Sequence, residues 1–98
     1  MLKRIVRMDF DPEKVKDFLE LFAVVEPKIA SFPGCNHLEL CQDPSLEHVY
    51  FTFSIWENES ALESYRHSEL FKSTWEKTKI LFGGKPLAYS LVDPKSTS

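Results

Sequence analysis

The segment His48–Trp56 places the strongest constraint on the fold, because it is apolar on both faces of an extended chain. Side chains alternate sides along a β-strand, so every second residue shares a face. One face holds Val49, Phe51, Phe53 and Ile55, and the other holds His48, Tyr50, Thr52, Ser54 and Trp56. Neither set is typical of a surface in water. We therefore expect this strand to lie in a sheet that is covered on both sides.

Three further segments have the period-two pattern of strands. They are Leu2–Phe10, Cys35–Cys41 and Leu87–Val92. The turn residues Asp43-Pro44-Ser45 separate the second of these from His48–Trp56. The two neighbouring strands should therefore pair as an antiparallel hairpin.

A helix is predicted after the first strand, where Asp11 can cap it and Pro12 can occupy its first position. Its apolar stripe has spacings of three and four and consists of Val15, Phe18, Leu19, Phe22, Val25 and Ile29. Pro27 is expected to end or kink the helix near Glu26. Pro33-Gly34 closes the helical region.

Two shorter helices follow the hairpin. Asn58 is the predicted cap of one that runs through Arg66, and Ser68 caps another that stops before Gly83-Gly84. The resulting order, β-α-β-β-α-β, is that of α+β ferredoxin-like domains with a four-stranded antiparallel sheet. At 98 residues the chain suits one domain, predicted over residues 1–93, with a flexible tail over 94–98.

Helices on one side of such a sheet leave its other face bare. We expect that second face to hold Ile5, Tyr50, Trp56 and either Ala88 or Tyr89. This is more apolar surface than a monomer usually exposes. The sequence therefore predicts a homodimer in which two sheets meet face to face about a two-fold axis.

The composition argues against nucleic-acid and membrane partners. The net charge is -3, and no basic run is interleaved with aromatic residues. No apolar stretch has the length of a membrane span, and basic residues interrupt the apolar start Met1–Arg7, so we expect a cytoplasmic protein. Cys35 and Cys41 lie about 20 Å apart in an extended chain, too far for a disulfide. No zinc-type spacing of Cys and His is present, and no metal is expected.

The sequence from Ile55 to Leu62, followed by Tyr65, Ser68 and Phe71, carries a family resemblance. It resembles the antibiotic biosynthesis monooxygenase (ABM) family of the dimeric α/β-barrel superfamily, in which a strand ends in Trp and a short helix begins. The Pro33-Gly34 turn and the order of elements also match, so the resemblance covers residues 1–93. It implies a dimer with a pocket in each subunit between sheet and helices. It also implies cofactor-independent oxygenation of aromatic or quinone-like compounds.

The haem-degrading members of this group offer a sharper comparison. Their site uses an Asn on the first strand, a Trp in the helix after the motif Trp, and a His ten residues beyond. The aligned positions here hold Val6, Tyr65 and Trp75. Without the His there is no axial ligand for iron at that position. We expect no haem and no other cofactor.

Arg4 and Glu26 are the charged candidates for a site, because both fall on apolar stripes. Arg4 needs an anionic partner, which is either a substrate carboxylate or phenolate or the side chain of Glu26. Glu26 is either a buried base with a raised pKa or a surface charge that the kink at Pro27 turns outward.

Tyr65 could hydrogen-bond a phenol or quinone oxygen, and His67 could serve in proton transfer or be exposed and inert. Arg4, Glu26, Tyr65 and His67 are thus the predicted catalytic residues. The predicted substrate-binding residues are Phe22, Phe51, Phe53, Phe71 and Trp75. If these rings fill the space themselves, the chain is instead a non-catalytic binding or stress-response module on the same fold.

Overall fold

The computed structural model describes residues 1–95 and has the predicted four-stranded antiparallel sheet. The strands are β1 (Leu2–Asp9), β2 (Cys35–Gln42), β3 (Val49–Trp56) and β4 (Leu87–Val92), in the order β2-β3-β1-β4. The α+β ferredoxin-like prediction is confirmed. Residues 96–98 of the predicted C-terminal tail lie outside the described residues.

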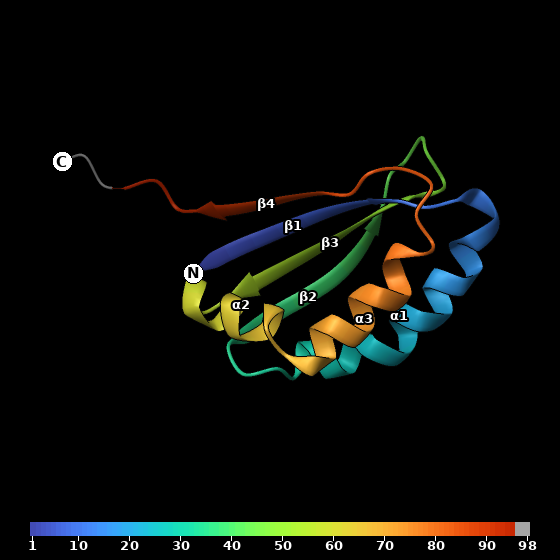
Figure 1. Ribbon diagram of the computed structural model, residues 1–98. Helices are drawn as coiled ribbons and strands as arrows, with labels where there is room; N and C mark the ends of the chain where they lie inside the picture. The colour runs from blue at the N-terminus through green and yellow to red at the C-terminus, as the bar shows by residue number, and fades with distance from the viewer. Residues whose placement is uncertain (96–98) are drawn as a thin grey trace.

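The helices lie on one face of this sheet (Figure 1). They are a turn of 3₁₀ helix (η1, Pro12–Lys14), α1 (Val15–Ala30), α2 (Glu59–Arg66) and α3 (Glu69–Lys79). All three predicted caps accept a backbone N–H: Asp11 that of Glu13 at 2.9 Å, Asn58 that of Ala61 at 2.8 Å, and Ser68 that of Phe71 at 3.1 Å. η1, α2 and α3 therefore each begin where a short polar side chain satisfies an otherwise free donor, whereas α1 continues from η1 without a side-chain cap of its own.

Pro27 was predicted to end or kink the helix near Glu26; it lies inside α1 and does not end it, so the first of these alternatives is wrong. The helix continues to Ala30, and Ser31 donates its backbone N–H and its hydroxyl to the Pro27 carbonyl at 3.1 and 2.8 Å. Proline removes only the bond that its own N–H would make to the carbonyl four residues earlier. That carbonyl belongs to Ala23 on the exposed side of α1, where water can replace the bond.

Gly34, in the turn after α1, has a backbone φ of 89°, a conformation that favours glycine. A Cβ at this position would also lie within 2.5 Å of the Ala61 side chain. The glycine therefore lets this turn pack directly against the first turn of α2.

The two faces of β3 are the reverse of the prediction. Tyr50 and Trp56 pair with Met8 and Leu2 of β1 and face the helices, and both are buried. Phe51 and Phe53 lie on the opposite, outer face, so their predicted place in an internal pocket is wrong. Both faces of β3 are apolar, and alternation alone does not tell which of them meets the helices.

The outer face is nevertheless apolar, but most of its residues differ from those predicted for it. Ile5 pairs with Phe53 on one side and with Tyr89 on the other, and Leu87 and Leu91 flank Tyr89 on the same face of β4. These three β4 side chains are exposed by 43–53%. The structure describes one chain, and the predicted dimer stays a prediction.

Two buried clusters hold the sheet and helices together. The first, which we call the Phe10 cluster, consists of Met8, Phe10, Phe18 and Tyr50. The second, the Trp56 cluster, consists of Leu2, Trp56 and Leu62. Among residues 1–95, none of the helices combines the length and the apolar run needed to cross a bilayer.

Candidate functional site

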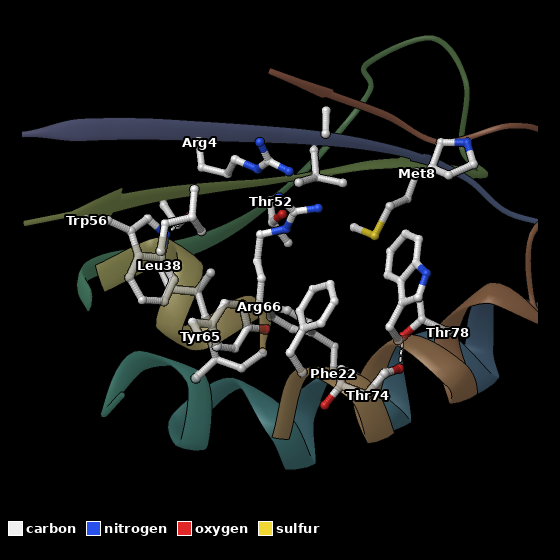
Figure 2. A pocket seen from close by; sticks show the side chains of 18 of the residues that line it. Arg4, Met8, Phe22, Leu38, Thr52, Trp56, Tyr65, Arg66, Thr74 and Thr78 are labelled. Atoms are coloured by element: carbon white, nitrogen blue, oxygen red, sulfur yellow. Dashed lines mark hydrogen bonds between the residues drawn. The ribbon is translucent and has the colours of Figure 1, made fainter. Parts of the chain in front are cut away.

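A cavity of about 240 Å³ lies between the sheet and the helices, in the region between the two clusters (Figure 2). Residues from β1, β2, β3, β4 and all three α-helices line it. The described lining residues are Arg4, Val6, Met8, Phe18, Phe22, Ile29, Leu38, Thr52, Ser54, Trp56, Leu62, Tyr65, Arg66, Phe71, Thr74, Trp75, Thr78, Pro86, Leu87 and Ala88. The wall is mostly apolar, as is usual for small-molecule sites.

The cavity exists because the middle of the sheet carries small side chains on its inner face. The pairs at the two ends are large: Leu2 with Trp56 and Met8 with Tyr50. Small residues surround Arg4 at the middle positions: Ser54 and Ser90 pair with Arg4 itself, and Thr52 and Ala88 pair with Val6. Apart from Arg4, the centre of the inner face therefore lacks the large apolar side chains that fill the space beneath the helices at the two ends.

Aromatic rings form the helical side of the cavity. Tyr65 stacks on Trp56 with ring centroids 5.0 Å apart, and Phe71 stacks on Trp75 at 6.0 Å. Tyr65 and Phe71 meet edge to face at 5.3 Å. These contacts fix the ring orientations, and planar apolar walls of this kind suit a flat aromatic ligand.

Two hydroxyls of the wall already have partners within the chain. Ser54 Oγ accepts the indole N–H of Trp56 at 3.0 Å, and Thr78 Oγ1 donates to the Thr74 carbonyl at 2.7 Å. Both bonds stabilise the fold. Among the described lining residues they leave Thr52, Tyr65 and Thr74 with hydroxyl groups that can bind a ligand.

Burial raises the pKa of the Tyr65 hydroxyl, with a smaller contribution from Cys35. The group is therefore protonated at neutral pH. It can donate a hydrogen bond to a ligand oxygen, and it does not act as a base there.

Two arginines line the cavity, Arg4 from β1 and Arg66 from α2, and Figure 2 shows both side chains extending into the space between sheet and helices. Arg4 donates to Ser90 Oγ at 2.8 Å. Its pKa is lowered first by burial and then by the positive charge of Arg66. Arg66 also donates to Glu63 Oε1 at 3.1 Å.

The structure brings together five of the predicted site residues and separates the other four. Arg4, Phe22, Tyr65, Phe71 and Trp75 line the cavity. The remaining four, Glu26, Phe51, Phe53 and His67, are not among the described lining residues.

The predicted ion pair between Arg4 and Glu26 is wrong. Arg4 donates to Ser90 instead, and among residues 1–95 it makes no ion pair. The cavity separates the centre of β1 from α1, which carries Glu26 as a half-buried side chain. His67 is exposed, and its Nδ1 lies 2.9 Å from the Glu63 carbonyl, which places it outside the cavity.

Arg66 is the main site residue that sequence reasoning missed. It follows Leu62 by four positions on a helix, and Tyr65 follows Leu62 by three, so all three share a face of α2. This shared helix face was the signal in the sequence that could have identified Arg66 as a residue of the cavity wall. Basic residues are common in the last turn of a helix, where they complement the helix dipole, so the position of Arg66 did not single it out.

No group of three or more His, Cys, Asp or Glu side chains suited to a metal is found within the described range 1–95. The cavity wall has no such group either, because its charged side chains among the described residues are those of Arg4 and Arg66.

Comparisons with known proteins agree with this architecture. The family model for antibiotic biosynthesis monooxygenase matches residues 1–77. No curated protein matches the chain.

Solved structures match over nearly the whole chain. One described as an antibiotic biosynthesis monooxygenase has a TM-score of 0.90 at 19% identity, covering 97% of this chain and 100% of that chain. A conserved protein from Methanosarcina mazei has a TM-score of 0.88 at 17% identity, covering 92% and 89%. Rv0793 from Mycobacterium tuberculosis has a TM-score of 0.87 at 15% identity, covering 99% and 98%. At these identities the likeness is one of fold.

Proposed function

Because the chain belongs to the antibiotic biosynthesis monooxygenase family, we propose that its cavity binds an aromatic or quinone-like compound and that O₂ oxygenates this compound there without a cofactor. The observation that carries the proposal is the cavity itself. It has stacked aromatic walls and a small number of polar groups that converge on its centre.

In the proposed reaction a hydroxyarene is converted to a quinone. One atom of O₂ becomes the new ring carbonyl oxygen. The other leaves as water, with the hydroxyl hydrogen and the hydrogen of the oxygenated carbon. The substrate supplies all the electrons that reduce O₂, so no outside reductant is needed.

The chain's own residues bind and orient the substrate in this scheme. The ring packs between the helical aromatic side chains and the sheet, and the protonated Tyr65 hydroxyl donates a hydrogen bond to the ring oxygen. The positive charge of Arg4 and Arg66 favours the ionised, electron-rich form of the hydroxyl group. Glu26 and His67 receive no role, because neither is among the described residues that line the cavity.

The test is oxygen consumption with 1-naphthol as the probe. The expected result is one naphthoquinone formed for each O₂ consumed, with one oxygen atom of the quinone derived from labelled O₂. Heat-denatured protein is the control for spontaneous oxidation. Consumption no faster than in that control, across a panel of hydroxynaphthalenes and hydroquinones, would contradict the proposal.

A second candidate function is a non-catalytic small-molecule-binding module. The observation that favours it is chemical: in the described part of the chain, no Asp, Glu, His, Cys or Lys lines the cavity to accept a proton. Saturable binding of 1-naphthol without any oxygen consumption would favour the module over the enzyme.

We also propose that the protein is a homodimer joined through the outer face of the sheet. Tyr89 lies at the centre of the apolar β4 side chains and is 53% exposed. Placing a carboxylate there by Tyr89→Asp should weaken association at least tenfold, because a buried charge without a partner is costly. Analytical ultracentrifugation measures the change, and Lys85→Asp on an exposed loop is the control. A wild-type monomer at high micromolar concentration would contradict the dimer.

A further inference from the structure

The polar part of the cavity wall carries two positive charges and, among the residues that the structure describes, no negative one. Arg4 and Arg66 approach from different elements, the central strand β1 and the last turn of α2. Both line one cavity, Figure 2 shows both side chains extending into it, and the charge of Arg66 acts on Arg4. The other described lining residues are uncharged.

These charges are poorly compensated within the chain. Arg4 is half-buried, and among residues 1–95 its guanidinium donates to the neutral hydroxyl of Ser90 and to no carboxylate. Arg66 meets Glu63, but the two side chains are 45% and 47% exposed, where an ion pair adds little. Each guanidinium has five N–H donors, and most of them are left for another acceptor.

Two like charges at one place raise the energy of the empty cavity. An anion bound between them would remove this cost and accept several charge-assisted hydrogen bonds. The depressed pKa of Arg4 has the same origin, since it follows from burial and from the nearby charge of Arg66.

We propose that Arg4 and Arg66 together bind the carboxylate of an aromatic acid whose ring occupies the apolar part of the cavity. A carboxylate fits better than a single phenolate oxygen, because it offers one oxygen to each of two planar forks that come from opposite walls. The inference rests on the proposed ligand site and adds the chemical class of its ligand.

Glu63 acts on this site as a competitor. It accepts from Arg66 at 3.1 Å, and its negative charge also acts on Arg4, so it competes with an anionic ligand for the same two positive charges. Removing its charge with Glu63→Gln should release Arg66 and tighten the binding of an anion. A purely structural role for Arg66 predicts no such gain.

The experiment is calorimetric titration under argon with 2-naphthoate and with its uncharged counterpart 2-naphthamide. The wild-type protein is expected to bind 2-naphthoate at least tenfold more tightly, and added salt should reduce only the naphthoate affinity. Arg4→Met and Arg66→Met should each weaken 2-naphthoate about tenfold and leave 2-naphthamide unchanged. Lys16→Met on the exposed side of α1 and Lys72→Met on the exposed side of α3 are the matched controls.

Equal affinities of the wild-type protein for the two probes would overturn the proposal, and this comparison needs no variant to fold. Equal losses for both probes in the arginine variants would do the same, because they would indicate damage to the fold. Absence of binding by 2-naphthoate also overturns it. None of these outcomes depends on turnover, so the oxygenation of 1-naphthol, an uncharged compound, remains a separate test of the proposed function.

Discussion

The Phe10 cluster and the cavity lie in the same layer, between the same sheet and the same helices, yet one is closed and the other is open. In the cluster, Phe10 stacks on Phe18 with centroids 4.1 Å apart, and Phe10 is fully buried. At the cavity, Val6, Thr52 and Ser54 are the inward residues around Arg4, and all three are small. The difference shows that side-chain size along β1 and β3 decides which part of the layer is core and which part is site.

The largest expected effect comes from emptying the closed region. Phe10→Ala should lower the free energy of unfolding by about 3–5 kcal/mol, because it leaves a void among tightly packed rings. Phe71→Ala, at the cavity wall, should cost about 1–2 kcal/mol, because Phe71 is only half-buried and borders empty space. Denaturant titration of both variants measures the contrast. Equal losses would contradict the distinction between a closed and an open region.

A second change fills the open region instead. Thr52→Leu should weaken the binding of 1-naphthol more than tenfold, which is over 1.4 kcal/mol, because the larger side chain occupies ligand space. Its effect on stability should stay within about 1 kcal/mol, since the cavity has room for it. Ser73→Leu on the exposed side of α3 is the control. Unchanged binding by the Thr52 variant would place the ligand elsewhere.

The periodicity of the sequence was sufficient to predict the fold. Strand and helix periods differ, and the cap residues Asp11, Asn58 and Ser68 marked the helix starts that the structure has. Pro27 misled because a proline in the last turn of a helix removes a single bond, and at an exposed position water replaces it.

The site was predictable only in part. Arg4, Tyr65 and Trp75 were found because large polar or charged groups on an apolar stripe need an explanation. Phe51 and Phe53 were misplaced because both faces of β3 are apolar. Only the register with β1, a non-local property, decides that the face with Tyr50 and Trp56 meets the helices.

The smallest expected effect concerns Tyr65 and alkaline pH. In the unfolded chain its hydroxyl loses a proton near pH 10, whereas burial raises its pKa in the folded protein. Above about pH 10 unfolding therefore releases a proton, and stability falls as the pH rises, by up to about 1.4 kcal/mol per pH unit for this one group. Below pH 10 the contribution is fully present. The free energy of unfolding of the Tyr65→Phe variant should therefore fall less steeply with pH over that alkaline range than that of the wild-type protein. Identical slopes for the two proteins would show that the Tyr65 hydroxyl is not shielded from water at the cavity wall.

The most direct test of the central claim, that the cavity is the ligand site, uses the two methionines of the chain. Met8 lines the cavity, whereas Met1 is 66% exposed, with its sulfur near the Asn36 amide. In a protein labelled at the methionine methyl groups, NMR titration with 1-naphthol under argon should shift the Met8 signal through the ring current of the bound ligand. The Met1 signal should stay in place. A shift of Met1 alone, or no shift of either signal at saturating ligand, would contradict the account.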